Sequence, residues 1–282
     1  MAIRLIGIDI DGTLLDSRWQ IPEDNQSAIS AAVDRGIEIA LVTGRRFDFA
    51  LPIASRIPHP LTMIVNNGAV IRAKTGETFH RQLLDREAAR RVLGATREHR
   101  SGTTVVFDRP RENQIIFESL DLSNNSRRDY WERNRQYIGE ASPLESCLTE
   151  DPIQVMFTGG FEAMRRVATL LRAIDGRDGM ATRDFSVFVT EYQEKDFSLV
   201  DILHPRASKG HALQTWAQMR GYRREEVMAI GDNLNDLEML EFAGVAVVMA
   251  NSVPELQRSG WLLTGTNDEA GVATAIEKYA LE

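Results

Sequence analysis

Acidic residues gather at two distant points of the 282-residue sequence, at Asp9 and Asp11 near its start and at Asp232 and Asp236 near its end. Asp9 and Asp11 are two positions apart, so their side chains can leave an extended segment on the same side. Carboxylates held together repel one another unless a proton or a cation lies between them. Mg²⁺ prefers a few carboxylate oxygens together with waters and a substrate phosphate. The pattern therefore predicts a Mg²⁺ site if the two segments meet in the fold.

Nitrogen and sulfur ligands are scarce. The five histidines show no metal-binding spacing, and Cys147 is the single cysteine, so the sequence does not predict a zinc site. A single cysteine also excludes an internal disulfide, which suits a reducing compartment. We therefore expect an oxygen-only metal site.

The elements that must position these residues are short apolar runs. Ile3–Ile10 runs into the Asp-Gly pair at Asp11, Ile37–Val42 ends at Thr43-Gly44, and Val227–Ile230 ends at Gly231-Asp232. Each run is typical of a buried strand. Ligands of open parallel α/β sheets bind beyond the carboxyl ends of the strands. If these strands are neighbours, their polar ends converge on one pocket.

Helical segments alternate with these strands. Pro22–Arg35, Lys209–Arg220 and Leu234–Phe242 have helical spacing, and further strands are expected at Leu61–Val65 and Val245–Met249. Alternating strands and helices predict an α/β fold, a Rossmann-like three-layer core with a parallel sheet covered on both faces.

A different segment interrupts this alternation. Helices are expected at Asp85–Glu98, Arg127–Tyr137 and Phe161–Ile174, and strands at Thr103–Phe107, Gln114–Glu118, Ile153–Phe157, Ser186–Thr190 and Ser198–Ile202. We therefore expect a core formed by residues 1–82 and 203–282 and an inserted α+β domain at 83–202.

The net charge and the apolar runs of the sequence limit the classes of partner and the location that we expect. The net charge of −8 repels nucleic-acid phosphates and anionic lipid, so neither is expected as a partner. No stretch approaches the ~20 apolar residues that cross a bilayer. The apolar run at the start is too short for a signal peptide, and Asp9 and Asp11 interrupt it. A cytoplasmic location is expected.

Taken together, the polar clusters resemble the four motifs of the haloacid dehalogenase superfamily. They are Asp9-Ile10-Asp11-Gly12-Thr13, the strand-end Thr43, the distant Lys209 and Gly231-Asp232-Asn233-Leu234-Asn235-Asp236, in the order of that superfamily. The insert between the second and third motifs resembles the cap of its Cof-type (class IIB) phosphatases in placement, size and strand-helix pattern. The resemblance covers nearly the whole chain.

The resemblance implies roles for the acidic residues. Asp9 would be the nucleophile that becomes an aspartyl phosphate, and Asp11 the general acid and then the general base. Asp9, the backbone carbonyl of Asp11 and Asp232 would hold Mg²⁺. Asp236 would orient Lys209 or a water on the metal.

The resemblance also implies a phosphate-binding set and supporting residues. Thr43, the Gly44 N–H, Lys209, Asn235 and backbone N–H groups near Ile10 would bind the phosphate. Thr13 belongs to the first motif. From the residues themselves, Gly12 lets the chain turn sharply, and Arg45, which follows the second motif, is expected either to reach the substrate or the cap or to form a structural salt bridge.

We therefore expect a Mg²⁺-dependent phosphatase of small phosphorylated metabolites, such as sugar phosphates, that acts through an aspartyl phosphate. A phosphomutase would share this intermediate but return the phosphoryl group to the substrate. A phospho-acceptor signalling domain would lack a general acid at Asp11 and the large insert, and an inactive sensor of sugar phosphates would not need the complete motif set. The sequence leaves the substrate and the oligomeric state open.

Overall fold

The computed structural model describes residues 2–119, 125–175, 184–192, 196–257 and 260–282. The chain forms two compact units, Met1–Arg81 with Ala207–Glu282, and Gln82–Arg206. The second unit differs from the predicted insert, 83–202, by a few residues at its ends. Each unit has its own sheet and its own hydrophobic core.

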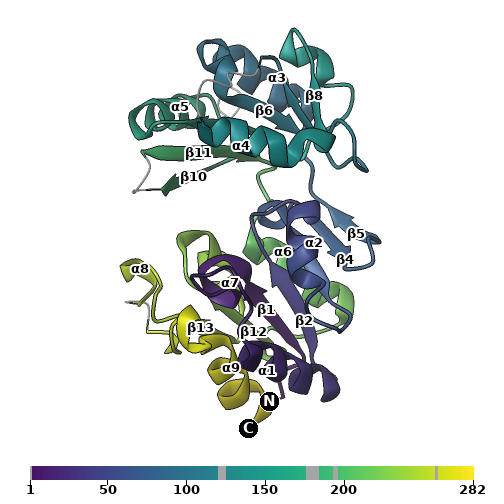
Figure 1. Cartoon of the computed structure of the whole chain (residues 1–282), viewed down its shortest axis with the longest axis vertical. Coiled ribbons are helices and arrows are strands. Elements are labelled where there is room, and N and C mark those ends of the chain that lie inside the picture. The colour runs from purple at the N-terminus through teal and green to yellow at the C-terminus, as the bar shows by residue number, and fades with distance from the viewer. Residues whose placement is uncertain (1, 120–124, 176–183, 193–195, 258–259) are drawn as a thin grey trace. The chain divides into compact units, whose positions relative to one another are not determined.

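The first unit is built on a sheet whose eight strands, counted over the described residues, run in the order β14-β13-β12-β1-β2-β3-β4-β5 (Figure 1). Neighbouring strands from β14 to β3 are parallel, and β3-β4 and β4-β5 are antiparallel. The strands are β1 Leu5–Asp9, β2 Glu38–Val42, β3 Thr62–Val65, β4 Val70–Ala73, β5 Thr78–Arg81, β12 Val227–Gly231, β13 Val245–Val248 and β14 Leu262–Leu263. Early and late parts of the chain therefore meet at the centre of the sheet, where β1 lies between β12 and β2.

Helices cover both faces of this sheet, which explains why β1 and β12 are buried along their whole length. Leu5, Ala40 and Val227 pack with α6 (Lys209–Arg220) and α7 (Leu237–Phe242) in one core cluster. On the opposite face, α1 (Glu23–Asp34) and α9 (Gly271–Ile276) pack together, and Figure 1 shows these two helices side by side. The unit also contains α2 (Phe47–Ala54) and α8 (Pro254–Gln257). The α/β fold class with a three-layer core, predicted from the sequence, is confirmed.

The sequence did not predict the antiparallel hairpin β4-β5 at the edge of this sheet. Residues of β5 are half-buried or exposed, so they form no continuous apolar run. An antiparallel edge strand that faces solvent carries a mixed pattern, which is hard to distinguish from a loop.

The second unit is an α+β domain. Its sheet, over the described residues, has six strands in the order β10-β11-β9-β6-β7-β8, and only the β7-β8 pair is parallel. They are β6 Thr103–Val106, β7 Ile115–Phe117, β8 Ile138–Glu140, β9 Gln154–Gly159, β10 Ser186–Tyr192 and β11 Phe197–Leu203, accompanied by α3 Arg86–Ala95, α4 Asn125–Asn134 and α5 Phe161–Ile174. The bounds of α5 agree with the prediction, whereas the predicted helix 127–137 is divided into α4 and a short 3₁₀ turn, Arg135–Tyr137.

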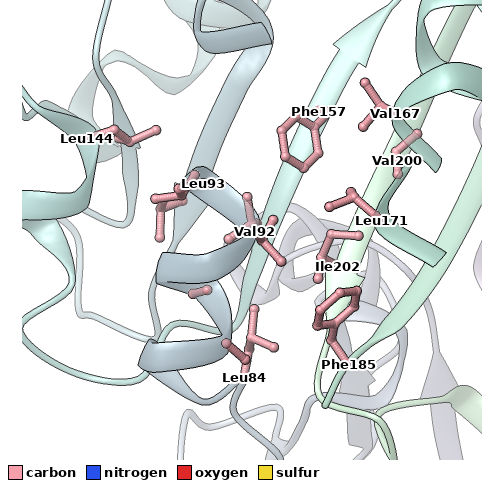
Figure 2. Packing of buried hydrophobic residues seen from close by; sticks show 14 of the residues in the cluster. Leu84, Val92, Leu93, Leu144, Phe157, Val167, Leu171, Phe185, Val200 and Ile202 are labelled. Carbon is pink, nitrogen blue, oxygen red and sulfur yellow. The ribbon is translucent and has the colours of Figure 1, made fainter. Parts of the chain in front are cut away.

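The core of the second unit lies between its sheet and two helices (Figure 2). Val92 of α3 and Leu171 of α5 pack against Phe157 and Ile202 of the sheet. This sheet-to-helix packing gives the insert a hydrophobic core independent of the first unit. No helix in the described parts of either unit is long and apolar enough to cross a membrane.

Candidate functional site

The parallel register of three strands brings the predicted site residues to one edge of the sheet. Asp9 is the last residue of β1 and lies opposite Val42 of β2, so Thr43 and Gly44 follow beside it. On the other side Ile8 pairs with Ile230, so Gly231 and Asp232 follow at the same edge. This edge is the carboxyl end of the parallel strands, where α/β sheets bind their ligands.

A buried ammonium group joins two of the acidic residues. Lys209 Nζ donates hydrogen bonds to Asp9 Oδ1 and to Asp236 Oδ1, both at 2.6 Å. The three side chains are 5% exposed or less. Ser208 caps α6 by accepting a hydrogen bond from the His211 N–H, so Lys209 stands at the first turn of a fixed helix. Lys209 is therefore held inside the cluster and is not a solvated surface lysine.

Asp232 joins the same cluster from the end of β12. Its Oδ1 accepts a hydrogen bond from Thr13 Oγ1 at 2.9 Å. Gly12 adopts φ +82°, and a Cβ there would lie 2.5 Å from Asp232 Oδ2. A side chain at position 12 would be strained by the left-handed backbone and would collide with the carboxylate. Gly12 therefore permits both the turn after β1 and the close approach of Asp232.

Asp236 accepts hydrogen bonds on both carboxylate oxygens. Its Oδ1 accepts from Lys209, and its Oδ2 accepts from the backbone N–H groups of Asp232 and Asn233, both at 3.0 Å. These bonds fix the loop that carries Asp232. Asp236 thus acts mainly as a positioning residue in this arrangement.

The electrostatics show a shortage of positive charge. Burial raises the pKa of Asp9 well above its usual range, and the nearby charge of Asp236 adds to this, although Lys209 opposes it. Burial and Asp236 likewise raise the pKa of Asp232 to about 6. Burial lowers the pKa of Lys209, but the carboxylates of Asp236 and Asp9 outweigh this and raise it. The ammonium is therefore charged, and the carboxylates require more positive charge than it supplies.

This cluster fits a divalent cation. Asp9, Asp232 and Asp236 each offer a carboxylate oxygen, and these oxygens lie within 4.8 Å of one another. When all are ionised, the three carboxylates and Lys209 together carry an excess of two negative charges. An all-oxygen donor set suits Mg²⁺. Asp9 and Asp232 are the better ligands, because the oxygens of Asp236 already have partners.

Asp11 does not join the buried cluster with its side chain. Arg45 Nε donates to Asp11 Oδ2 at 2.8 Å and Arg45 Nη2 to Asp11 Oδ1 at 2.6 Å, in a bidentate ion pair. The Asp11 side chain is 42% exposed. The two carboxylates of the first motif therefore have different environments, Asp9 buried beside Lys209 and Asp11 half-exposed beside Arg45.

The end of β2 packs against a turn after β3. Thr43 is buried, and its Oγ1 accepts a hydrogen bond from the Arg45 N–H at 3.1 Å. A Cβ on Gly44 would lie 2.9 Å from Asn67 Oδ1. Asn66 and Asn67 both have φ near +50°, and neither Asn66 Nδ2 nor Asn67 Oδ1, both buried, has a hydrogen-bond partner among the described residues. The asparagine pair therefore forms a tight turn, and it leaves Asn67 Oδ1, unpaired among the described residues, close to Gly44.

The other predicted phosphate-binding groups lie around the same edge. Asn235 is in the short turn η8 (Leu234–Asp236) and exposes its side chain to solvent. Ile10 opens the turn η1 (Ile10–Leu14), with its side chain buried. Neither observation assigns a ligand to these residues.

Asn251 was not identified from the sequence. Its Nδ2 donates to the Gly12 carbonyl at 2.8 Å, and its Oδ1 accepts from the Asn267 N–H at 2.9 Å. Asn251 thereby anchors the turn that carries Asp11. No local sequence signal predicts this contact, because Asn251 and Gly12 are 239 residues apart.

The whole chain is similar to known proteins. The sequence matches the family model of the haloacid dehalogenase-like hydrolases over residues 6–276. YxeH of Bacillus subtilis is 31% identical over 295 residues, which cover 99% of this chain and 98% of that protein. The 5-amino-6-(5-phospho-D-ribitylamino)uracil phosphatase YwtE of the same species is 26% identical, with 98% of both chains covered.

Solved structures share the fold over the full length. A haloacid dehalogenase-like hydrolase from Bacteroides thetaiotaomicron superposes with a TM-score of 0.78 at 25% identity, covering 98% of this chain and 99% of that chain. A sugar phosphatase of subclass IIB superposes with a TM-score of 0.77 at 18% identity, covering 99% of this chain and all of that chain. The similarity therefore includes both units.

Proposed function

The chain belongs to the haloacid dehalogenase-like hydrolase family, and from this premise we propose that it is a Mg²⁺-dependent phosphatase that hydrolyses a small phosphomonoester through a phosphoryl group carried on Asp9. The observation that carries the proposal is the buried cluster at the carboxyl edge of the sheet, where Lys209 Nζ bonds Asp9 Oδ1 at 2.6 Å beside Asp232. An enzyme of this family needs a fixed nucleophile and positive charge at one point, and this cluster offers both.

Asp9 is suited to attack phosphorus. Lys209 holds Oδ1, and the other carboxylate oxygen is the one that would form the bond to phosphorus. That bond forms as the bond from phosphorus to the leaving oxygen breaks, which leaves the phosphoryl group on Asp9. Covalent catalysis of this kind divides one difficult displacement into two easier ones. Asp9 is 3% exposed, so little water competes for its carboxylate.

Positive charge is needed because a carboxylate must approach a phosphate that is itself negative. Lys209 supplies one charge at the point of attack, and backbone N–H groups after β1 and β2 supply further donors. When bound by Asp9, Asp232 and the Asp11 carbonyl, Mg²⁺ would neutralise charge on the phosphate oxygens and help to orient them. Thr43, Gly44 and Asn235 complete the proposed phosphate-binding set.

Asp11 would transfer the protons. In its protonated form it donates a proton to the leaving oxygen, and the resulting carboxylate then accepts a proton from the water that cleaves the Asp9–phosphoryl bond. Arg45 donates to both Asp11 oxygens, so a leaving oxygen that bonds to Asp11 competes with Arg45 for the same carboxyl group. We therefore expect substrate binding to shift Arg45 away from Asp11.

The substrate class follows from the relatives only at a general level. The name of YwtE describes a phosphatase that acts on a ribityl phosphate attached to a uracil ring. The subclass IIB structure belongs to a sugar phosphatase. Both support a small phosphorylated metabolite as the substrate of this chain, without distinguishing between sugar phosphates and related phosphomonoesters.

A phosphate-release screen tests the proposal. The wild-type protein is incubated with Mg²⁺ and a panel of phosphomonoesters, and Asp9→Asn and Asp11→Asn are compared with it on the best substrate. We expect Asp9→Asn and Mg²⁺ removal each to abolish phosphate release, and mass spectrometry of rapidly denatured enzyme to find one phosphoryl group on the peptide that contains Asp9.

Two results would contradict this. Phosphate release by Asp9→Asn in the absence of Mg²⁺ would exclude the proposed mechanism. An isomerised sugar phosphate without free phosphate would instead identify a phosphomutase.

A further inference from the structure

Trp19 adopts a backbone conformation that tryptophan rarely has. It lies in the loop between η1 and α1, with φ +62°, and it is 61% exposed. A bulky residue in the left-handed region is an outlier, whereas asparagine and glycine enter it readily. The indole is also mostly exposed, so it lacks most of the burial that usually stabilises tryptophan. Neither local backbone preference nor core packing therefore explains tryptophan at position 19.

The loop has its own hydrogen bonds, none of which needs the Trp19 side chain. Asp16 Oδ1 accepts from the N–H groups of Arg18 at 2.9 Å and Gln20 at 2.8 Å. The Asp16 N–H donates to the Gln20 carbonyl, and the Trp19 N–H donates to the Asp16 carbonyl. Asp16 itself is 7% exposed. The turn is thus fixed by Asp16 and the backbone, and it presents whatever side chain stands at position 19.

The presented indole lies next to the candidate site. The Arg45 guanidinium carbon is 5.3 Å from the centre of the Trp19 ring, and the same guanidinium bonds both oxygens of Asp11. One guanidinium therefore separates the indole from the carboxylate proposed to protonate the leaving oxygen. The group attached to that oxygen must lie close to Asp11, which is the side of the site where Arg45 and Trp19 stand.

We propose that Trp19 is a substrate-binding residue that packs against a ring in the leaving group, a sugar ring or a planar heterocycle. A ring presents a flat face with C–H groups or π-electrons that an indole contacts over a large area, whereas a short acyclic group does not. This inference rests on the proposed phosphatase function. It implies that the substrates are ring-bearing phosphomonoesters. It also implies that the free-energy cost of the left-handed backbone at Trp19 is tolerated because the indole binds the substrate.

Asparagine is the informative replacement. Trp19→Asn keeps the turn, since asparagine tolerates positive φ, and it removes the indole. With Mg²⁺ present, we expect Trp19→Asn to raise KM for p-nitrophenyl phosphate about five- to tenfold, with kcat nearly unchanged and KM for acetyl phosphate unchanged. Trp19→Phe should recover most of the loss. Met219→Ala, which removes another exposed apolar side chain, is the control and should behave as wild type.

Thermal unfolding separates binding from folding. Trp19→Asn should be as stable as the wild type or more stable, because it relieves backbone strain. An equal loss on both substrates would mean that Trp19 acts only through Arg45 or the loop. Unchanged kinetics on both would mean that it is only a turn residue. Either result overturns the inference.

A binding measurement distinguishes this inference from the proposed function. Calorimetry with Mg²⁺ and two non-hydrolysable phosphonates compares benzylphosphonate with methylphosphonate. We expect Trp19→Asn to weaken benzylphosphonate about five- to tenfold and to leave methylphosphonate unchanged. If this difference is found in a protein that releases no phosphate, the proposed function fails and the ring-binding role of Trp19 stands. If phosphate is released but the difference is absent, the proposed function stands and the ring-binding role of Trp19 fails.

Discussion

Replacing Lys209 with methionine tests the charge balance of the site most directly. Methionine has a similar length but no charge, and Lys209 is 2% exposed with two carboxylate partners at 2.6 Å. Removing one partner of a buried ion pair costs about 3–5 kcal/mol, because the other charges remain buried without compensation. We therefore expect Lys209→Met to lower the free energy of unfolding by about this amount at pH 8 in EDTA.

The loss should depend on pH and on Mg²⁺. The pKa of Asp9 is raised by burial and that of Asp232 is raised to about 6, so both carboxyls bind a proton more tightly in the fold than in the unfolded chain. A carboxyl with a raised pKa stabilises the fold below its unfolded pKa and loses this contribution as the pH rises through its folded pKa. The destabilisation of Lys209→Met should therefore be smaller at pH 5 than at pH 8. Saturating Mg²⁺ should reduce it at pH 8, because the cation supplies charge that the ammonium supplied.

Urea unfolding at pH 5 and 8, with EDTA or Mg²⁺, measures these effects. Lys278→Met is the matched control, because Lys278 is exposed on the last helical turn and should change stability by less than about 0.5 kcal/mol. Phosphate release should fall about 10²–10³-fold in Lys209→Met, the usual loss for one charged donor in an anionic transition state.

Equal stability of Lys209→Met and Lys278→Met at pH 8 in EDTA would refute the claim that Lys209 compensates a buried acidic cluster. A double variant tests whether the lost stability is caused by charge and not by altered packing of the methionine. Lys209→Met with Asp236→Asn removes one uncompensated carboxylate and should recover part of the lost stability.

Three further predictions concern the turn at Gly12, the buried Asp201 of the second unit and the binding of Mg²⁺. Gly12→Ala places a Cβ at φ +82° and 2.5 Å from Asp232 Oδ2, so it should cost about 1–3 kcal/mol in urea unfolding and weaken Mg²⁺ binding in calorimetry; unchanged Mg²⁺ affinity would contradict the close approach. Asp201 accepts a hydrogen bond from Gln154 Nε2, and burial raises the pKa of Asp201 to about 7. The contribution of Asp201 to stability is therefore present below about pH 4 and is lost as the pH rises through 7. Asp201→Asn keeps an acceptor for Gln154 and should unfold like the wild type at pH 4 but be more stable by on the order of 2–4 kcal/mol at pH 8; equal stability at both pH values would exclude a buried charge at Asp201. Adding Mg²⁺ to the EDTA-treated protein should raise the unfolding temperature more at pH 8 than at pH 5, since protons compete for Asp9 and Asp232, and the same shift in Asp232→Asn would locate the cation elsewhere.

Elements of the fold that bury both faces were predictable from the sequence. The continuous apolar runs of β1 and β12 mark strands covered by helices on both sides, and α5 was predicted with its observed bounds because its apolar residues recur at helical spacing. The hairpin β4-β5 and the two-residue, exposed β14 were not predicted. Strands that are short or half-exposed have a pattern shared with many loops, so their assignment depends on a neighbouring strand.

The candidate site, too, was predictable from the sequence only in part. The motif residues and their strand-end positions were recognisable in the sequence, but the environment of each carboxylate was not. Asp9 and Asp11 are two positions apart, yet one is buried against Lys209 and the other pairs with Arg45 near the surface. The strand β1 ends at Asp9, and Asp11 already lies in the turn η1, so the regular alternation of a strand does not set the directions of both side chains. Only the three-dimensional path of the backbone specifies them.

The sequence by itself determined which chemical groups are available, the order of the strands and helices that carry them, and the sharp turn that follows Asp11. Tertiary structure alone decided that Lys209, 200 residues away, bonds Asp9, that Asn251 holds Gly12, and that Trp19 lies over Arg45. The physical reason is that short-range patterns of size and polarity fix local backbone conformation, whereas contacts between distant side chains depend on strand pairing and on how helices pack across the sheet.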